Sequence, residues 1–319
     1  MPTILDGNRV RDEILRELRP RVVALAAATR PPGLAVVLVG HDPGSQIYVR
    51  NKVKACAELG IASLTLTPPA TITTDELLEI VEGLNRRPDI DGILVQLPLP
   101  PQVDTRRVLL AVSPEKDVDG FHPMNIGNLV AGRPGPRPCT PAGIMELLRQ
   151  YRIPLAGKRA VVVGRSDIVG KPMALLLLHA HATVTICHSR TVDLPGVCRE
   201  GEILVAAMGR PAMLTADYIR PGAVVVDVGM NRVTDRAEAA RIFRDSPERL
   251  ATLERKGSVL VGDVDPVGMR EKSAAYTPVP GGVGPLTIAM LMSNTVSAAE
   301  AGRTGLRPVA DRPGGLSYH

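Results

Sequence analysis

The order of short apolar runs and helix-like segments is the feature that most constrains the fold of this chain. In the first half the apolar runs are short, as in buried strands, and segments with a helical spacing of apolar residues separate them. We expect strands at residues 34–39, 62–67 and 91–96 and helices at residues 8–29, 45–60 and 74–85. Strands that alternate with helices form a parallel sheet between helical layers, and ligands bind beyond the carboxyl ends of its strands. The first half is therefore predicted to be a three-layer α/β domain.

The second half repeats this alternation and adds a glycine turn. An apolar run ending at Val163 leads into Gly164, and a helix starts after Gly170. Strand, glycine turn, helix and strand make up a Rossmann-like dinucleotide-binding half with a parallel sheet. Ser166 stands where the second glycine of G-x-G-x-x-G would be, so a tight turn in any α/β domain explains the motif equally well. Further strands are expected at residues 183–187, 203–207, 223–228 and 259–264.

The length of 319 residues exceeds what one hydrophobic core usually serves, so two domains are expected. We assign residues 1–146 plus 284–301 to the first, catalytic domain and residues 147–283 to the dinucleotide-binding domain. Residues 232–258 are charged and only weakly helical, and we interpret them as a surface excursion between strands. Residues 302–319 are rich in Gly, Pro and Arg and are expected to form a disordered tail.

Composition excludes several classes of protein. The net charge is +5, but the basic residues are mixed with acids and no basic run carries interleaved aromatics, so no nucleic-acid partner is expected. No apolar run approaches the roughly 20 residues of a membrane helix and no signal sequence is apparent, so we expect a soluble, cytoplasmic protein with no membrane partner. The four cysteines form no C-x-x-C pair and lack a histidine at zinc-ligand spacing, which predicts buried, reduced thiols.

The predicted helix at 45–60 carries the first candidate site residue, Lys52. Ser45 is the expected N-cap of this helix and Gly60 its C-terminal glycine. Tyr48 lies one turn before Lys52, so the lysine sits between an aromatic ring and small or apolar neighbours. Such a lysine is either an ordinary residue at the core boundary with its ammonium in water, or a partly desolvated acid/base, because desolvation lowers a lysine pKa. The helix alone leaves both interpretations open.

Three loops supply further candidates. Gln96 ends a predicted strand, and Asp117 and Asp119 precede a glycine in the loop that follows. Loop carboxylates are usually solvated, but close to a glutamine and a lysine they would suit a donor-rich heterocycle. The stretch 276–287 combines prolines with glycines, which favours either a rigid hinge or a loop whose backbone N–H groups approach a ligand closely.

The end of the predicted strand at 183–187 favours NADP over NAD. Domains that prefer NAD place an acid there to hold the ribose 2′-hydroxyl group, whereas this chain has Ser189 and Arg190. A hydroxyl and a guanidinium suit a 2′-phosphate, and Arg165 lies across the turn. Asp167 adds a negative charge to this turn, which would weaken NADP binding unless its side chain points to solvent or caps the next helix.

These segments, in this order, resemble the bifunctional methylenetetrahydrofolate dehydrogenase/methenyltetrahydrofolate cyclohydrolase family. The matching stretches are residues 48–52, 91–99, 114–120, 138–141, 163–170 and 277–287. The resemblance implies that 5,10-methylenetetrahydrofolate is oxidised with NADP and that the methenyl product is hydrolysed to 10-formyltetrahydrofolate, in one-carbon metabolism. It also implies a site in the cleft between two domains and a homodimer, and it implies no metal.

By the same resemblance, each candidate residue acquires a role. Lys52 would be the acid/base, with a lowered pKa, and Gln96 would orient its amine. Tyr48 would stack on the folate, and Asp119 would receive hydrogen bonds from the pterin. The folate pocket would be completed by Pro280, Gly281, Gly282 and Val283. The dinucleotide would contact Gly164, Arg165, Ser166 and Ser189, to which we add Arg190 from its charge and position.

Residues 232–258 depart from the family pattern, because they are longer and more charged than expected in this connection. We expect them, and the tail, to lie away from the proposed cleft. One alternative function is a two-domain dehydrogenase of a hydroxy or keto acid, but the first domain shows no clear set of basic residues for a carboxylate. Another is an NADP(H)-sensing protein without turnover. The retention of all four catalytic-domain candidates, Tyr48, Lys52, Gln96 and Asp119, argues against it. A rise in melting temperature with folate would favour the enzyme.

Overall fold

The computed structural model describes residues 1–304, so residues 305–319 of the expected tail lie outside the described part. The described chain divides into two compact units. The small-sheet unit comprises Arg11–Cys139 and the chain from Thr287, and the large-sheet unit comprises Met1–Val10 and Thr140–Leu286. In contrast to the expected assignment, the first ten residues belong to the large-sheet unit. Residues 302–304, expected to begin the tail, are the end of helix α12.

The small-sheet unit is built on three parallel strands. Its elements are α1 (Gly7–Ala28), β2 (Gly33–Val37), α2 (Pro43–Leu59), β3 (Ala62–Leu66), α3 (Thr74–Arg86), β4 (Gly92–Val95), α4 (Thr105–Ala111), α5 (Pro123–Val130) and α12 (Gly284–Thr304). The strand order is β3-β2-β4, and Leu34 of β2 lies opposite Ser63 and Gly92. The chain therefore passes from β3 across β2 to β4, which makes the carboxyl ends of β2 and β4 a topological switch point, where ligands bind in such sheets.

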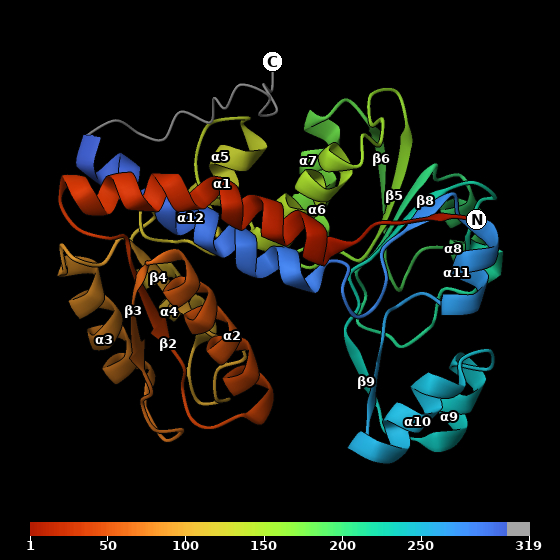
Figure 1. Ribbon diagram of the computed structural model, residues 1–319, viewed down its shortest axis with the longest axis horizontal. Coiled ribbons are helices and arrows are strands. Elements are labelled where there is room, and N and C mark those ends of the chain that lie inside the picture. Colours follow the sequence, from red (N-terminus) through yellow and green to blue (C-terminus); the bar gives the residue numbers. More distant parts are fainter. Residues whose placement is uncertain (305–319) are drawn as a thin grey trace. The chain divides into compact units, whose positions relative to one another are not determined.

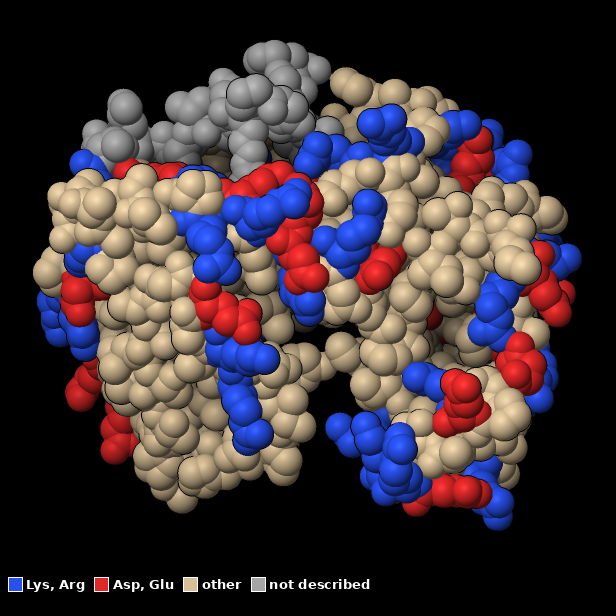
Figure 2. Space-filling model, viewed as in Figure 1, with Lys and Arg blue, Asp and Glu red and all other residues tan. Residues whose placement is uncertain are grey.

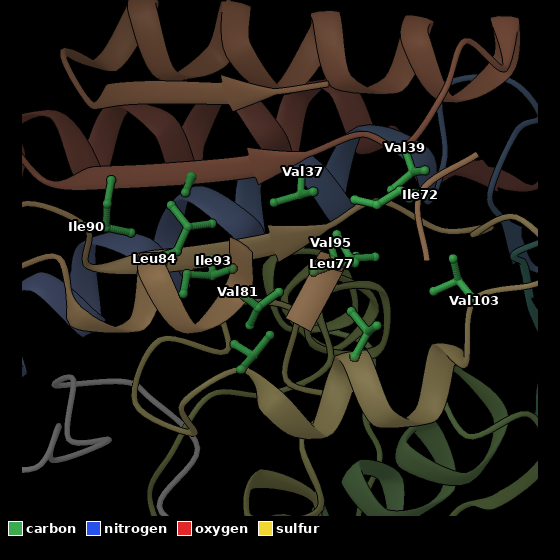
Figure 3. Packing of buried hydrophobic residues seen from close by; sticks show 13 residues of the cluster. Val37, Val39, Ile72, Leu77, Val81, Leu84, Ile90, Ile93, Val95 and Val103 are labelled. Carbon is green, nitrogen blue, oxygen red and sulfur yellow. The ribbon is translucent and has the colours of Figure 1, made fainter. Parts of the chain in front are cut away.

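Helices cover both faces of the small sheet, because successive βαβ crossovers to opposite sides of β2 place α2 and α3 on opposite faces. The core on one face joins Ala35 and Val37 of the sheet to α3 and α4 (Figure 3). Figure 1 shows α1 and α12 running side by side on this unit, and Arg21 of α1 pairs with Glu300 of α12 at 2.9 Å. The expected three-layer arrangement is thus present.

The large-sheet unit contains a six-stranded parallel sheet in the order β1-β11-β8-β7-β5-β6. Its elements are β1 (Thr3–Ile4), α6 (Cys139–Gln150), β5 (Arg159–Val163), α7 (Gly170–His179), β6 (Thr183–Cys187), α8 (Leu194–Arg199), β7 (Ile203–Ala206), a 3-10 turn (Ala216–Tyr218), β8 (Val224–Asp227), α11 (Pro266–Lys272) and β11 (Ala275–Tyr276). The chain leaves β5 for β6 and then returns past β5 to β7, so this sheet also has its switch point at the end of the first long strand.

One expected strand belongs to a different sheet. Residues expected as a strand at 259–264 form β10 (Val259–Val261), which pairs antiparallel with β9 (Asn231–Val233) instead of joining the parallel sheet. The parallel sheet is completed by β1 and β11, two-residue strands that the apolar pattern does not predict. A strand of two residues is too short to show an alternating or a continuous apolar pattern, so β1 and β11 could not be recognised in this way.

The charged stretch between β9 and β10 folds as two helices, α9 (Arg236–Ile242) and α10 (Pro247–Lys256). They have a small core of their own, formed with residues of β9 and β10. Figure 2 shows side chains of both charge signs interspersed over these helices, and Arg236 pairs with Glu254 across them at 3.1 Å. We call residues 234–258 the helical insert.

Among residues 1–304, no helix combines the length and the apolar content that crossing a membrane requires. All four cysteines are buried and unbridged, as the sequence predicts.

Candidate active site

Helix α2 holds Lys52 at the switch point of the small sheet. The side chain of Asp42 caps this helix by accepting a hydrogen bond from Ser45 N at 2.7 Å, and Pro43 occupies the first turn. The expected N-cap, Ser45, is therefore wrong, because the aspartate before Pro43 starts the helix two residues earlier. Gly60 ends the helix with φ +82°, the left-handed conformation that glycine adopts without strain.

Lys52 is 8% exposed, so its ammonium does not lie in bulk water. Its Nζ donates to Gln96 Oε1 at 3.0 Å. The amide group of Gln96 is oriented in turn, since its Nε2 donates to Leu97 O at 2.7 Å. Gln96 follows β4 directly, and its N–H bonds to Val37 O of β2, which fixes it at the carboxyl edge of the sheet. The structure thus brings together two of the predicted site residues and rules out the surface interpretation of Lys52.

The two predicted loop carboxylates differ in their surroundings. Asp117 is buried and accepts hydrogen bonds from Gly120 N, His122 N and Asn125 Nδ2 at 2.8–3.1 Å, so it shapes the loop. Asp119 accepts no hydrogen bond from the described residues. Burial raises the pKa of Asp119 to about 6, against the nearby positive charge of Lys52 and with the negative charge of Asp117. Asp119 is thus a carboxylate available to a ligand beside Lys52.

Two further residues border this site and were not predicted to belong to it. Cys139 is buried, and its pKa is raised well above the usual thiol value by burial and by the charge of Asp119. Asn294 of α12 donates from Nδ2 to Val118 O at 2.8 Å and to Arg137 O at 3.0 Å. It therefore ties the backbone before Asp119 to helix α12. The sequence signal for Asn294 is an amide within a largely apolar helix, which calls for a buried partner.

Tyr48 lies one helical turn before Lys52 on α2 and is 43% exposed. A tyrosine this exposed presents its ring to a ligand without rearrangement of the core. The predicted proximity of Tyr48 to Lys52 follows from the i, i+4 spacing on the helix.

The turn after β5 in the large-sheet unit requires both of its glycines. Gly164 has φ +138°, and a Cβ there would lie 2.1 Å from Ala207 O. A Cβ on Gly170 would lie 2.2 Å from Gly164 O. Ser166 Oγ accepts hydrogen bonds from Val169 N and Gly170 N at 3.2 Å, so this serine orders the turn that starts α7. The close approach of backbone to backbone leaves the amino end of α7 at the edge of the sheet, a common place for an anion.

The predicted phosphate-binding side chains are exposed at this edge. Arg165 follows β5, while Ser189 and Arg190 follow the neighbouring parallel strand β6, and all three are exposed. Asp167 is also exposed and pairs with Lys171 one turn later. The Asp167 side chain therefore points to solvent, which is the arrangement in which its charge is not expected to weaken NADP binding.

The glycine- and proline-rich loop after β11 is fixed at both ends. Thr277 Oγ1 accepts a hydrogen bond from Asp227 N at 2.8 Å and donates to Asp227 O at 3.3 Å. Further along, Gly281 O accepts from Gly7 N at 2.9 Å. Gly7 itself allows no side chain, because a Cβ there would lie 1.6 Å from Gly282 O. Residues 277–283, which we call the glycine-proline loop, thus have a defined backbone.

Among residues 1–304, no cluster of His, Cys, Asp and Glu has the arrangement of a metal site. The groups that are present are a buried lysine held by an amide, a free carboxylate beside it, and a glycine turn with exposed cations in the other unit. Such groups are typical of a two-domain α/β enzyme with a dinucleotide-binding sheet.

Comparison with known proteins identifies the family. Residues 5–119 match the family model of the tetrahydrofolate dehydrogenase/cyclohydrolase catalytic domain, and residues 138–303 match that of the NAD(P)-binding domain. The bifunctional protein FolD of Solibacter usitatus is 71% identical over 94% of this chain and 98% of its own, and that of Koribacter versatilis is 62% identical over 95% and 98%. This chain belongs to the tetrahydrofolate dehydrogenase/cyclohydrolase family.

Comparison with solved structures supports the same family and the same fold. The chain resembles the bifunctional FolD enzyme of Campylobacter jejuni with a TM-score of 0.85 and 43% identity, covering 94% of this chain and 99% of that one. It resembles the Trypanosoma brucei methylenetetrahydrofolate dehydrogenase-cyclohydrolase, solved with NADP and an inhibitor, with a TM-score of 0.84 and 38% identity over 95% and 98%. The bifunctional family and the two-domain α/β fold expected from the sequence are both confirmed.

Proposed function

We propose that this chain oxidises 5,10-methylenetetrahydrofolate with NADP⁺ and hydrolyses the methenyl product at a site centred on Lys52. The two activities follow from its membership of the bifunctional family. The observation that supports Lys52 as the residue of the second activity is the hydrogen bond from Lys52 Nζ to Gln96 Oε1 at 3.0 Å, in a lysine that is 8% exposed. A structural surface lysine would need neither burial nor an oriented amide partner.

In the first step a hydride ion leaves the methylene carbon of the folate, which becomes the methenyl cation. NADP⁺ supplies the hydride acceptor. The chain contributes orientation, since a hydride transfer requires donor and acceptor carbons to be held in contact. We propose that the small-sheet unit holds the folate and the large-sheet unit holds NADP, in line with the separate family models of the two regions.

In the second step water adds to the methenyl carbon, the bond from that carbon to one ring nitrogen breaks, and the proton left on the added hydroxyl group is released to solvent as the formyl C=O of 10-formyltetrahydrofolate forms. We propose that the Lys52 amine accepts a proton from the attacking water and returns one to the departing ring nitrogen. The cysteine beside this site is unsuited to act as a nucleophile, because the pKa of Cys139 is raised by burial and by Asp119, which keeps the thiol protonated.

Binding roles are proposed for the remaining site residues of the small-sheet unit. Asp119, whose carboxylate accepts no hydrogen bond from the described protein, would receive N–H groups of the pterin. Tyr48, exposed one turn from Lys52, would stack on the folate. The backbone of the glycine-proline loop would contact the folate at Pro280, Gly281, Gly282 and Val283.

NADP fits the turn of the large-sheet unit, where Gly164 and Gly170 admit a close backbone approach and exposed cations lie at the same edge. Arg165, Ser166 and Ser189 would contact the phosphates, and Arg190 the 2′-phosphate, as a guanidinium binds phosphate well. We further propose a homodimer, which light scattering would test. We also propose a cytoplasmic location, consistent with four unbridged thiols.

An absorbance experiment tests the function directly. Purified protein is mixed with methylenetetrahydrofolate and NADP⁺ or NAD⁺, and the reduced nucleotide and methenyltetrahydrofolate are followed together. The expected result is NADPH formation without methenyl accumulation. Accumulation of the methenyl compound would show that the second activity is weak, and absence of reduced nucleotide with either cofactor would contradict the dehydrogenase. A dinucleotide sensor without turnover is not favoured, and no observation supports a hydroxy-acid dehydrogenase.

A further inference from the structure

The helical insert is not an independent appendage of the large-sheet unit. Its core residues pack with β9, β10 and Ala212, which lies in the loop after β7. Arg244 of the insert forms two hydrogen bonds to Asp265, from Nη1 at 2.8 Å and from Nη2 at 3.0 Å. Asp265 is buried and caps α11 by accepting from Gly268 N at 2.8 Å. The insert is therefore docked on the unit by a core and by a bidentate ion pair.

A second arginine of the insert makes a different kind of contact. Arg249 extends from α10 over the ring of Phe243, with its Cζ 4.7 Å from the ring centroid. Its Nη2 donates to Leu260 O in β10 and to Val279 O, the latter at 3.3 Å. The guanidinium is partly buried, and desolvation lowers the pKa of Arg249. A partly desolvated cation needs hydrogen-bond acceptors, and among the described residues the two carbonyl groups supply them for Arg249.

Val279 lies in the middle of the glycine-proline loop, directly before Pro280. The two ends of that loop are held by the rest of the unit, through Thr277 to Asp227 at one end and through Gly281 O to Gly7 N at the other. The Arg249 contact falls between these two points. Although residues 232–258 are expected to lie away from the proposed cleft, Arg249 contacts the loop that carries four of the predicted folate-contacting residues.

We propose that Arg249 is a positioning residue, through which the helical insert sets the conformation of the glycine-proline loop for folate binding. This inference rests on the proposed folate role of the loop. Arg249 touches neither substrate nor cofactor in this assignment; it acts through the carbonyl of Val279. Anchoring of the insert is not its main purpose, because the core of the insert and the Arg244–Asp265 pair already supply that.

The test replaces Arg249 with Met, which keeps much of the side-chain volume and removes both hydrogen bonds. The KM for methylenetetrahydrofolate should rise roughly five- to tenfold, the range expected from losing a charge-assisted hydrogen bond that orders a binding loop. The kcat and the KM for NADP⁺ should change less than twofold. Arg249→Lys, which retains the charge and an N–H donor group, should recover part of the loss. Arg255→Met is the matched control, because Arg255 is exposed on the same helix.

Hydrogen exchange supplies a readout that a purely structural role would not move. In Arg249→Met the hydrogen-bonded amides at the two ends of the loop, Thr277 N to Val225 O and Leu286 N to Val283 O, should exchange faster, whereas loss of docking alone would speed exchange in residues 234–258 only. Unchanged folate KM and unchanged loop exchange in a folded variant would overturn the inference while leaving the proposed function intact. A wild-type protein that neither turns over nor binds tetrahydrofolate by calorimetry would instead overturn the proposed function, and this inference with it.

Discussion

Lys52 Nζ and Gln96 Oε1 lie 3.0 Å apart, although 44 residues separate the two in the chain. The pair exists because α2 and the end of β4 meet at the same edge of the small sheet. The Gln96 side-chain amide accepts a hydrogen bond from Lys52 and donates one to Leu97 O. The lysine amine is thereby held at a fixed place and in a fixed direction, as an acid/base requires.

Replacing Lys52 with Met should abolish the cyclohydrolase step while the protein stays folded. A general acid/base contributes about 10²- to 10⁴-fold to a rate, so ring opening should fall by that factor. Methenyltetrahydrofolate consumption, followed by absorbance, measures the effect. The control is Lys54→Met, because Lys54 is exposed and pairs with the exposed Glu58 one turn later at 3.7 Å. Ring opening at the wild-type rate in Lys52→Met would assign the proton transfers to another group.

Folate binding should weaken as the pH falls through about 6. The pKa of Asp119 is raised from 3.8 to about 6, mainly by burial, so below that pH its carboxyl is protonated and loses acceptor capacity for pterin N–H groups. The KM for methylenetetrahydrofolate should rise toward low pH and level off above about 7. Asp119→Asn serves as the control, since any pH dependence that persists in it belongs to the substrate or to another residue.

The same shift has a consequence for stability. The folded-state pKa of Asp119 lies above its unfolded value, so the native state binds the proton more tightly. Stability from this group is fully present below about pH 4 and is lost as the pH rises through about 6. Asp119→Asn should remove this component from the pH dependence of unfolding.

Removing the exposed side chains after β6 should lower the preference for NADP⁺. In Ser189→Ala combined with Arg190→Ala, we expect binding of NADP⁺ to weaken by roughly 10- to 100-fold, since charged hydrogen bonds contribute about 1.5–3 kcal/mol. Binding of NAD⁺ should change little. Calorimetric titration with both nucleotides gives the comparison. Equal weakening for both would show that the two residues do not recognise the 2′-phosphate.

Asp227→Asn should destabilise the large-sheet unit. The buried carboxylate of Asp227 accepts from Gly229 N, Asp263 N and Val264 N at 2.8–2.9 Å. An amide in its place turns a donor toward these N–H groups and leaves at least one unpaired, at a cost of about 2–4 kcal/mol. Chemical denaturation measures the change. Asp235→Asn should be nearly neutral, because Asp235 is an N-cap at the surface and asparagine caps equally well. A similar stability for both variants would mean that the N–H groups around position 227 find other partners.

The pairing of Lys52 with Gln96 illustrates what sequence could provide. The local pattern places Lys52 within a helix and Gln96 at a strand end, and the rule that ligand sites lie beyond parallel strands predicts that they lie near each other. The glycine turn of the second sheet was recognised in the same way. In both cases a long, strongly patterned element fixes the position of the functional side chain.

The contacts that were not predicted from the sequence join residues that lie far apart in the chain. Asn294 reaches Val118 O only because α12 packs on the small-sheet unit, and no local pattern encodes that contact. The reach of Arg249 to Val279 depends on how the helical insert docks, which the charge pattern of residues 232–258 does not contain. Asp42, and not Ser45, is the N-cap because the aspartate stands directly before a proline. The spacing of apolar residues along the helix contains no information on this first turn.

The pairing of β1 with β11 determines when the large sheet can be finished. Thr3 lies opposite Ala275, so β1 is synthesised roughly 270 residues before the strand with which it pairs. At about 5–20 residues per second, that interval is roughly 15–50 s of synthesis. During this interval β1 has no strand with which to pair. Likewise, a proteolytic fragment that begins near Thr140 would lack β1 and would present β11 as an open edge, inviting pairing with another chain. Residues 1–10 therefore complete the large sheet only after β11 has been made. Cleavage after them would expose a strand edge of the nucleotide-binding unit, a large effect for a segment of ten residues.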